Sequence, residues 1–298
     1  MNFGKMLTAM VTPFDDHGNV DLKRTTILLE HLIKSGSDGV VVCGTTGESP
    51  TLSDEEKLQL FEHVIKVAAG RLKVIVGTGG NNTAQSVHFS KQAAKLGPDA
   101  IMAVAPFYNK PNQEGIYRHY RAIAESVDVP VVIYNIPGRS KVNITAETVI
   151  RLSQIANIVA VKEASGDLDQ MAAIISGTGP DFHLYSGDDG LTLPILSIGG
   201  RGVISVASHV IGPELKQMIE DFESGRNKQA AAEHRMMLPF MRTLFAAPSP
   251  APIKTMLNEI GIPVGGIRLP LVELTEKEHT DLLNVYRAFK EQAAPLHK

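Results

Sequence analysis

The chain has 298 residues, of which 43% are hydrophobic and 20% charged, and its formal net charge is −3. That length suits one barrel-sized domain with an appendage, and the absence of a basic run argues against nucleic acid as a partner. A single cysteine, Cys43, cannot form an intrachain disulfide, which favours a reducing compartment. The sequence shows neither a signal peptide nor an apolar run long enough to span a bilayer, so we expect a cytoplasmic protein that does not enter a membrane.

Short apolar runs rich in β-branched residues recur along most of the chain. Each is bounded by Gly, Pro, Asn, Ser or Asp, as is typical of buried parallel strands. Segments with helical periodicity separate most of them, and the runs start roughly 20–35 residues apart, the size of one βαβ unit. The predicted strands span 7–11, 39–42, 74–77, 100–104, 131–135, 158–162, 182–186 and 202–205. Such an alternation fits a closed barrel or a doubly wound sheet, and the number eight, with no glycine-rich phosphate loop, favours an α/β fold of the (β/α)8 TIM barrel type.

After about Gly212 the strand pattern ends and only helical patterns follow. Helices are predicted over 213–223, 228–245, 252–259 and 275–291, the last starting at a capping box of Thr275 and Glu278. Within the barrel, the best helix covers 54–69 and has its own capping box, Ser53 and Glu56. We therefore predict a catalytic barrel over 1–224 and a C-terminal all-helical appendage over 225–298 that packs on it.

Reactive groups of such barrels lie where strands end and βα loops begin. Lys162 closes the apolar run Ile158–Val161, and strand alternation points it the same way as Ala160. A lysine buried inside a barrel would have a lowered pKa and a neutral, nucleophilic amine that can form an imine with a carbonyl substrate. The alternative is that the strand ends one residue early and Lys162 reaches solvent, and the strand pattern alone leaves the two interpretations about even.

Other strand ends carry hydroxyl and guanidinium groups. Tyr134 and Thr46 could pass protons, although a barrel tyrosine or threonine more often serves packing. Arg139 has the fork that suits a carboxylate, but a surface arginine is the commoner case. Asp188 and Asp189 fit a turn and a helix cap better than a metal pair, and the ten histidines show no metal-binding spacing, so no metal is expected.

Two long patterns resemble the dihydrodipicolinate synthase/N-acetylneuraminate lyase superfamily. The first runs from Gly39 to Ser49 and contains Gly44-Thr45-Thr46-Gly47-Glu48; the second begins at Tyr134-Asn135-Ile136-Pro137 and ends at Val161-Lys162-Glu163-Ala164. The resemblance covers the barrel and its helical tail, and two patterns in the right order make chance agreement very improbable.

The resemblance implies a class I pyruvate lyase with a role for each matched residue. Lys162 would form the Schiff base, Tyr134 would move protons, and Thr46 would link Tyr134 to Tyr108 of a neighbouring subunit. Further residues implied to bind substrate are Thr45, Thr46, Arg139, Ile204 and Gly187. No cofactor is implied beyond the covalent imine on Lys162, and a homo-oligomer, a tetramer built as a dimer of dimers, is expected.

The loops Tyr108–Pro111 and Gly138–Ser140 resemble the dipicolinate synthase branch, in which the arginine matched by Arg139 binds the carboxylate of L-aspartate 4-semialdehyde. This branch condenses pyruvate with that semialdehyde in lysine biosynthesis. The alternatives are another pyruvate-dependent aldolase, of the N-acetylneuraminate or 2-keto-3-deoxy-gluconate type, and a non-catalytic barrel that binds a keto acid.

Lysine-sensitive members of the family bind lysine between subunits through histidines, a glutamate and a tyrosine. This chain has Asp54 and Lys57 in place of the histidines, Gln85 in place of the glutamate and Phe107 in place of the tyrosine. Gln85 offers no charge to a desolvated ammonium, and Lys57 adds a repelling cation. The sequence therefore predicts an enzyme that lysine does not inhibit.

Overall fold

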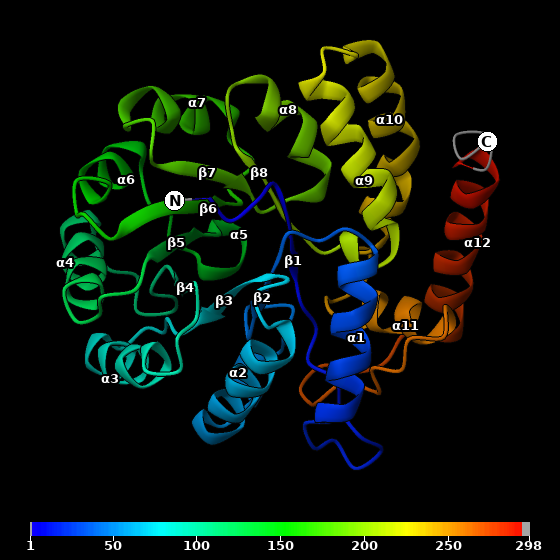
Figure 1. Cartoon of the computed structure of the whole chain (residues 1–298), viewed down its shortest axis with the longest axis horizontal. Helices are drawn as coiled ribbons and strands as arrows, with labels where there is room; N and C mark the ends of the chain where they lie inside the picture. The colour runs from blue at the N-terminus through cyan, green and yellow to red at the C-terminus, as the bar shows by residue number, and fades with distance from the viewer. Residues whose placement is uncertain (1, 294–298) are drawn as a thin grey trace.

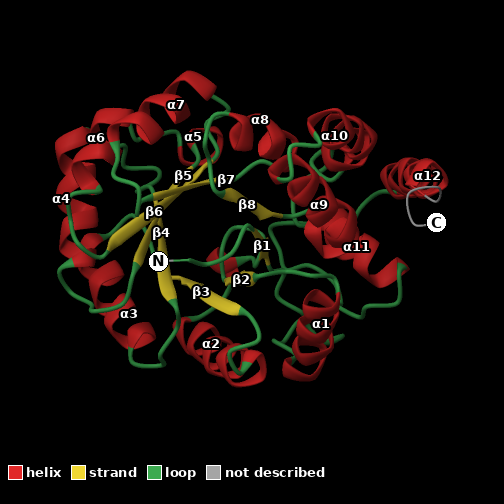
Figure 2. Ribbon diagram, turned by 45° about the horizontal axis from the view of Figure 1, so that its top comes forward, coloured by secondary structure: helices red, strands yellow, loops and turns green. Residues whose placement is uncertain are grey.

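The computed structural model describes residues 2–293, and eight parallel strands close into a barrel at its centre (Figure 2). Neighbouring strands follow chain order, and β1 pairs with β8 to complete the ring. The strands are β1 Met6–Ala9, β2 Gly39–Val42, β3 Lys73–Gly77, β4 Ala100–Val104, β5 Val131–Asn135, β6 Ile158–Glu163, β7 His183–Ser186 and β8 Gly202–Ser205. The predicted α/β TIM barrel is confirmed, and half of the strands have the predicted bounds.

Helices surround the barrel as an outer layer (Figures 1 and 2). They are α1 Leu22–Lys34, α2 Asp54–Ala68, α3 Thr83–Ala94, α4 Gln113–Ala124, α6 Ala146–Leu152, α7 Leu168–Gly177, α8 Thr192–Ser197 and α9 Ser208–Glu223, with the short turns η1 Ser49–Thr51, α5 Pro137–Ser140 and η2 Asp189–Leu191. Helix α2 starts at the predicted capping box of Ser53 and Glu56 and buries Leu60, Phe61 and Val64. It ends at Ala69, which adopts the left-handed conformation just before Gly70.

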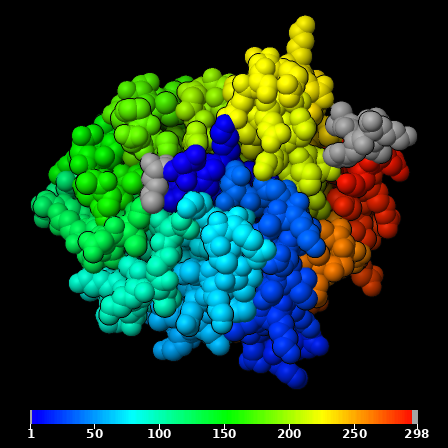
Figure 3. Space-filling model, viewed as in Figure 1, coloured from blue at the N-terminus to red at the C-terminus, as the bar shows by residue number. Residues whose placement is uncertain are grey.

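Three more helices, α10 Asn227–Thr243, α11 Ala251–Glu259 and α12 Glu276–Ala293, lie together on one side of the barrel (Figure 1). In the space-filling view the yellow and orange segments border the blue N-terminal part of the chain, and the red segment lies beyond the orange one (Figure 3). The predicted capping box at the start of α12 is present, because the Glu278 N–H donates to Thr275 Oγ1 and the Thr275 N–H donates to Glu278 Oε2. Within residues 2–293 no helix is long and apolar enough to cross a membrane, and the last predicted appendage residues, 294–298, lie outside the described part.

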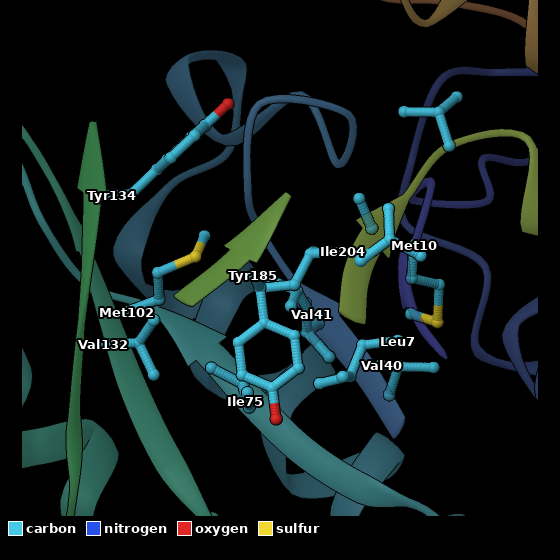
Figure 4. Packing of buried hydrophobic residues seen from close by; sticks show 14 of the residues in the cluster. Leu7, Met10, Val40, Val41, Ile75, Met102, Val132, Tyr134, Tyr185 and Ile204 are labelled. Carbon is cyan, nitrogen blue, oxygen red and sulfur yellow. The ribbon is translucent and has the colours of Figure 1, made fainter. Parts of the chain in front are cut away.

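Apolar side chains fill the barrel, and its two ends differ in chemistry (Figure 4). At the amino end, the Tyr185 hydroxyl points away from the packed interior and donates to the Gly4 carbonyl, 2.9 Å away. Tyr134 lies at the opposite end, beyond Met102 and Val132. The polar groups that could react therefore gather at the carboxyl ends of the strands, as is usual in this fold.

Candidate active site

Lys162 points into the barrel from the inner face of β6. Its neighbour in the strand register is Tyr134 on β5, and its Nζ lies 4.4 Å from the centroid of the Tyr134 ring. Only 5% of Lys162 is exposed. Strand β6 continues to Glu163, so the alternative in which the strand ends early and the lysine reaches solvent is wrong.

The ammonium form of Lys162 is disfavoured by its surroundings. Burial lowers the pKa of Lys162 to about 8, an effect that the carboxylate of Asp189 opposes and the guanidinium of Arg139 reinforces. A lysine with that pKa has a substantial neutral fraction near neutral pH, whereas an exposed lysine with a pKa near 10.4 has almost none. The site thus supplies an amine that can attack a carbonyl carbon.

Gly187, at the start of the loop after β7, leaves room for the Lys162 side chain. A Cβ at Gly187 would lie 3.2 Å from Lys162 Cε and only 2.7 Å from the Ala164 Cβ. The Gly187 N–H also donates to the Glu163 carbonyl at 2.7 Å, which holds the loop against the end of β6. A larger residue here would clash with Ala164 and crowd the lysine.

Tyr134 is 4% exposed, and burial raises its pKa to about 12. Thr45 lines the same cavity as Tyr134, and its hydroxyl lowers that pKa, as does the charge of Arg139. We expected Thr46 in this position; Thr46 is buried and is not among the residues that line the cavity, and its part in a proton relay stays a prediction. The chain leaves β2 through Cys43 in a left-handed conformation, with φ 53°, so strand alternation no longer decides which threonine points inward.

Two cavities meet at Arg139. The first, of about 380 Å³, is lined by Thr45, Tyr134 and Arg139 among others. The second, of about 390 Å³, is lined by Gly187 and Arg139, and the two share Ile136 as well. An arginine between them can attract an anionic group in either, and its fork suits a carboxylate. Ile204, on β8, is 1% exposed and belongs to the packed interior beneath the cavities.

Tyr108 does not reach the cavity of its own chain. Its side chain is 87% exposed, and its backbone has φ 73°, a conformation uncommon for a bulky residue. The structure therefore does not bring Tyr108 to Tyr134 within one protomer, and a role for it across a subunit interface stays a prediction.

A polar network on the outer face of β5 and β6 supports the two reactive strands. Asn135 and Glu163 are the register neighbours that follow Tyr134 and Lys162, and both are fully buried. Asn135 Nδ2 donates to Glu163 Oε2 at 3.0 Å, and the Gln170 side chain on α7 donates to the same oxygen at 3.1 Å. These bonds fix the ends of β5 and β6 relative to each other, and with them the lysine and the tyrosine.

Asp189 is a functional candidate that the sequence interpretation missed. Asp188 caps η2 as a turn residue should, but Asp189 is buried and its Oδ2 accepts the N–H groups of Val206 and Ala207. Its charge raises the pKa of Lys162. Because a capping aspartate and a buried one look the same in Gly187-Asp188-Asp189-Gly190, no local signal separates them.

In the part of the chain that the structure describes, no three His, Cys, Asp or Glu side chains are placed to hold a metal ion. Two histidines that are buried, His119 and His209, have pKa values lowered to about 4 by burial. Cys43 is a buried free thiol that lines the first cavity. None of these groups adds a metal-ligand set to the lysine, tyrosine and arginine.

The chain was compared with known proteins. Residues 2–288 match the model of the dihydrodipicolinate synthetase family. A 4-hydroxy-tetrahydrodipicolinate synthase of Listeria welshimeri is 58% identical over 95% of this chain and 97% of its own. Among solved structures, the dihydrodipicolinate synthase of Bacillus anthracis has a TM-score of 0.95 at 53% identity, covering 96% of this chain and 98% of its own.

A second solved structure, the enzyme of Cyanidioschyzon merolae with lysine bound, has a TM-score of 0.94 at 48% identity, again covering 96% of this chain and 98% of its own. Similarity at this level extends through the barrel and the C-terminal helices alike. With a buried lysine beside a tyrosine at the carboxyl end of its barrel, the chain belongs to the dihydrodipicolinate synthetase family.

Proposed function

We propose that this protein is a lyase that condenses pyruvate with L-aspartate 4-semialdehyde through a Schiff base on Lys162, the reaction for which its relatives are named. The observation that carries the residue assignment is the buried Lys162 amine, which lies beside the Tyr134 phenol below a cavity edged by Arg139. The reaction belongs to the diaminopimelate route to lysine, and the lysine imine serves as the electron sink in place of a cofactor.

The first half of the reaction forms an enamine. The neutral Lys162 amine attacks the keto carbon of pyruvate, and loss of water gives the imine. Removal of a methyl proton then yields the enamine, and Tyr134 with Thr45 is placed to pass these protons. Thr45, Thr46 and the neighbouring backbone amides are proposed to hold the pyruvate carboxylate, while Ile204 and Gly187 border the space it occupies.

The second half joins the substrates. The enamine carbon attacks the aldehyde carbon of the semialdehyde, whose carboxylate is held by Arg139. The amine of the new chain then displaces Lys162 from the imine carbon, which closes the ring and frees the lysine. Holding both substrates at one site converts a bimolecular encounter into an effectively unimolecular step.

A product assay tests this function. Purified protein with pyruvate and L-aspartate 4-semialdehyde should consume both and give the cyclic product. Pyruvate with N-acetylmannosamine, or with glyceraldehyde as the partner for a keto-deoxy sugar acid, should give far less. Turnover of the sugar aldehydes in preference to the semialdehyde would contradict the proposal, and a protein that binds pyruvate without any turnover would be a keto-acid-binding barrel.

The pH dependence should follow the neutral form of Lys162. Because the amine must lose its proton before it attacks, kcat/KM for pyruvate should rise with pH and level off above a midpoint near 8, the pKa to which burial lowers Lys162. Asp189→Asn removes the carboxylate that favours the ammonium form, so this midpoint should move to lower pH. The measurement is a pH profile of kcat/KM for pyruvate with saturating semialdehyde.

Asp188→Asn is the matched control, because Asp188 is exposed and an asparagine can cap η2 equally well. It should leave the midpoint where it is in the unaltered protein. A midpoint that moves equally in both variants, or upward in Asp189→Asn, would show that Asp189 does not set the protonation of Lys162.

Arg139 should matter chiefly for the semialdehyde. Arg139→Ala should raise the KM for semialdehyde by about ten-fold or more, since a charge-assisted carboxylate bond contributes roughly 1.5–3 kcal/mol. The KM for pyruvate should change much less. Arg139→Lys keeps the charge and loses the fork, so its loss should be intermediate. Equal effects on both KM values would mean that Arg139 does not select the second substrate.

L-Lysine should not inhibit the enzyme. Lys57 lines the first cavity together with Ser49 and Phe107. Its Nζ lies 3.3 Å from Asp54 Oδ1, so the Asp54 carboxylate is already paired with a cation. Initial rates, measured with both substrates near their KM values, should not change as L-lysine is raised to several millimolar, well above about 1 mM. The Cyanidioschyzon merolae enzyme, whose structure has lysine bound, is the positive control for binding. Half-inhibition at or below about 1 mM, roughly 4 kcal/mol of binding, would show that a lysine site survives.

We further propose a homotetramer built as a dimer of dimers, in which Tyr108 of one subunit completes the site of its neighbour. The exposure of Tyr108 and its position on the loop after β4 support this arrangement. We also propose that the chain divides into a barrel over 1–224 and an appendage over 225–298. A cytoplasmic location is a further proposal, supported by the buried free thiol of Cys43.

A further inference from the structure

A buried ion pair joins the loop after β2 to the C-terminal helices. Lys254 on α11 is 1% exposed, and its Nζ lies 2.7 Å from Oε1 of Glu48, which is 3% exposed. The two residues are 206 positions apart in the chain. Removing two charges from water is costly, so this pair needs a reason beyond surface electrostatics.

Both charged groups have further partners. Lys254 Nζ also donates to the Gly266 carbonyl at 2.6 Å and lies 4.0 Å from the centroid of the Phe14 ring. The second carboxylate oxygen of Glu48 accepts the backbone N–H of Arg268 at 3.0 Å. The Arg268 side chain in turn donates to the Thr51 carbonyl at 2.7 Å. The segment after α11 therefore holds the loop at Glu48 and at Thr51.

The loop held in this way carries Thr45. The Glu48 N–H donates to the Thr45 carbonyl at 3.1 Å, and Glu48 itself is in the left-handed conformation with φ 55°. From the other side, the Thr12 hydroxyl donates to the Gly47 carbonyl at 2.7 Å. A displacement of the Glu48 side chain would thus be transmitted through this short turn to Thr45, which lines the first cavity together with Tyr134.

We propose that the Glu48–Lys254 ion pair is a positioning device, through which the C-terminal helices fix the Thr45 hydroxyl against Tyr134 for proton transfer. The proposal rests on the proposed function and deepens it. Neither residue touches the substrate; both act through Thr45. The pair also explains why helices outside the barrel accompany the catalytic loop in one chain.

A purely stabilising role makes a different prediction. Replacing a buried ion pair by uncharged groups of similar size is often neutral or favourable for stability, whereas removing one partner leaves an unpaired buried charge. The double variant Glu48→Gln/Lys254→Met removes both charges and keeps an acceptor for the Arg268 N–H. If the pair only stabilises, this variant should regain stability and activity together; if it positions Thr45, stability should return without activity.

The test compares Glu48→Gln, Lys254→Met and the double variant in the full-length protein. Borohydride trapping at saturating pyruvate, carried to its end point, reports whether Lys162 can still form the imine, and kcat with semialdehyde reports the rate of the steps that need proton transfer. We expect trapping of one pyruvate per chain in all three, with kcat lower by about ten- to a hundred-fold, because a displacement of about 1 Å can cost ~10²-fold. The thermal midpoint of the double variant should match that of the unaltered protein.

A double-mutant cycle with Thr45→Val shows whether the effect passes through Thr45. In the Lys254→Met or Glu48→Gln background, Thr45→Val should lower kcat much less than it does alone. Lys290→Met is the matched control, since Lys290 on α12 pairs with Glu214, 3.2 Å away and outside the loop. It should keep the kcat of the unaltered protein.

The outcomes are distinguishable. An unaltered protein that does not turn over the semialdehyde would refute the proposed function, whereas variants with unchanged kcat, losses that multiply with Thr45→Val, or trapping that falls in step with kcat would overturn the positioning role. Should Lys254→Met fail to fold, Glu48→Gln decides the question, because Lys254, with a pKa lowered to about 8 by burial, can release its proton and remain buried.

Discussion

Lys162→Ala should abolish both the borohydride-trapped pyruvate adduct and the condensation, with kcat lower by about 10⁴-fold or more. The amine that it removes is the only protein atom that bonds to pyruvate in the proposed mechanism. Its replacement also removes a buried cation, so folding should not suffer from the lost charge. Mass spectrometry after reduction should find one adduct per chain in the unaltered protein, located on Lys162 by peptide mapping.

Lys254 makes this mapping a sharp test, because burial lowers its pKa to about 8 as well. A low pKa alone does not make a lysine a nucleophile. The Lys254 amine donates hydrogen bonds to Glu48 and to the Gly266 carbonyl, so we do not expect it to react. Lys162→Met preserves the volume and serves as the control for packing. An adduct on Lys254, or an adduct that persists in both Lys162 variants, would refute the assignment.

The second large effect is expected for the hydroxyl relay. Tyr134→Phe and Thr45→Val should each lower kcat by about 10²-fold or more, since general acid–base catalysis contributes roughly 10²- to 10⁴-fold. The double variant should lose little more than the worse single one, because both hydroxyls belong to one path. Thr46→Val is the matched neighbour and should change the KM for pyruvate more than kcat. Losses that multiply, or a larger kcat loss for Thr46→Val than for Thr45→Val, would contradict the relay through Thr45.

Tyr108 extends the same prediction across subunits. Tyr108→Phe and Lys162→Ala chains are each expected to be nearly inactive, but oligomers that contain both should regain activity, because some sites would combine an intact lysine with an intact partner tyrosine. The activity of purified hybrids, separated by different affinity tags, is the measurement. Hybrids with no recovered activity would mean that Tyr108 acts within its own chain or not at all.

Much of the architecture can be predicted from short segments of the sequence. A buried parallel strand needs a short β-branched run, and a helix start needs a capping side chain, so the strands over 39–42 and 131–135 and the capping boxes at Ser53 and Thr275 could be predicted residue by residue. The position of Lys162 at the end of such a strand made it a candidate nucleophile, but the strand pattern left a buried and an exposed lysine about even, and the role was implied by the family resemblance.

The tertiary structure decided what depends on irregular backbone and on residues far apart in the chain. The inward orientation of Lys162 depends on β6 reaching Glu163, and the position of Thr45 at the cavity depends on a left-handed Cys43. The charge that raises the pKa of Lys162 against the effect of burial comes from Asp189. The two residues of the Glu48–Lys254 ion pair are 206 positions apart in the chain. Strand and helix periodicities describe only regular backbone. The partner of a charge or a hydrogen bond is decided by distance in space, and a local sequence pattern does not contain that distance.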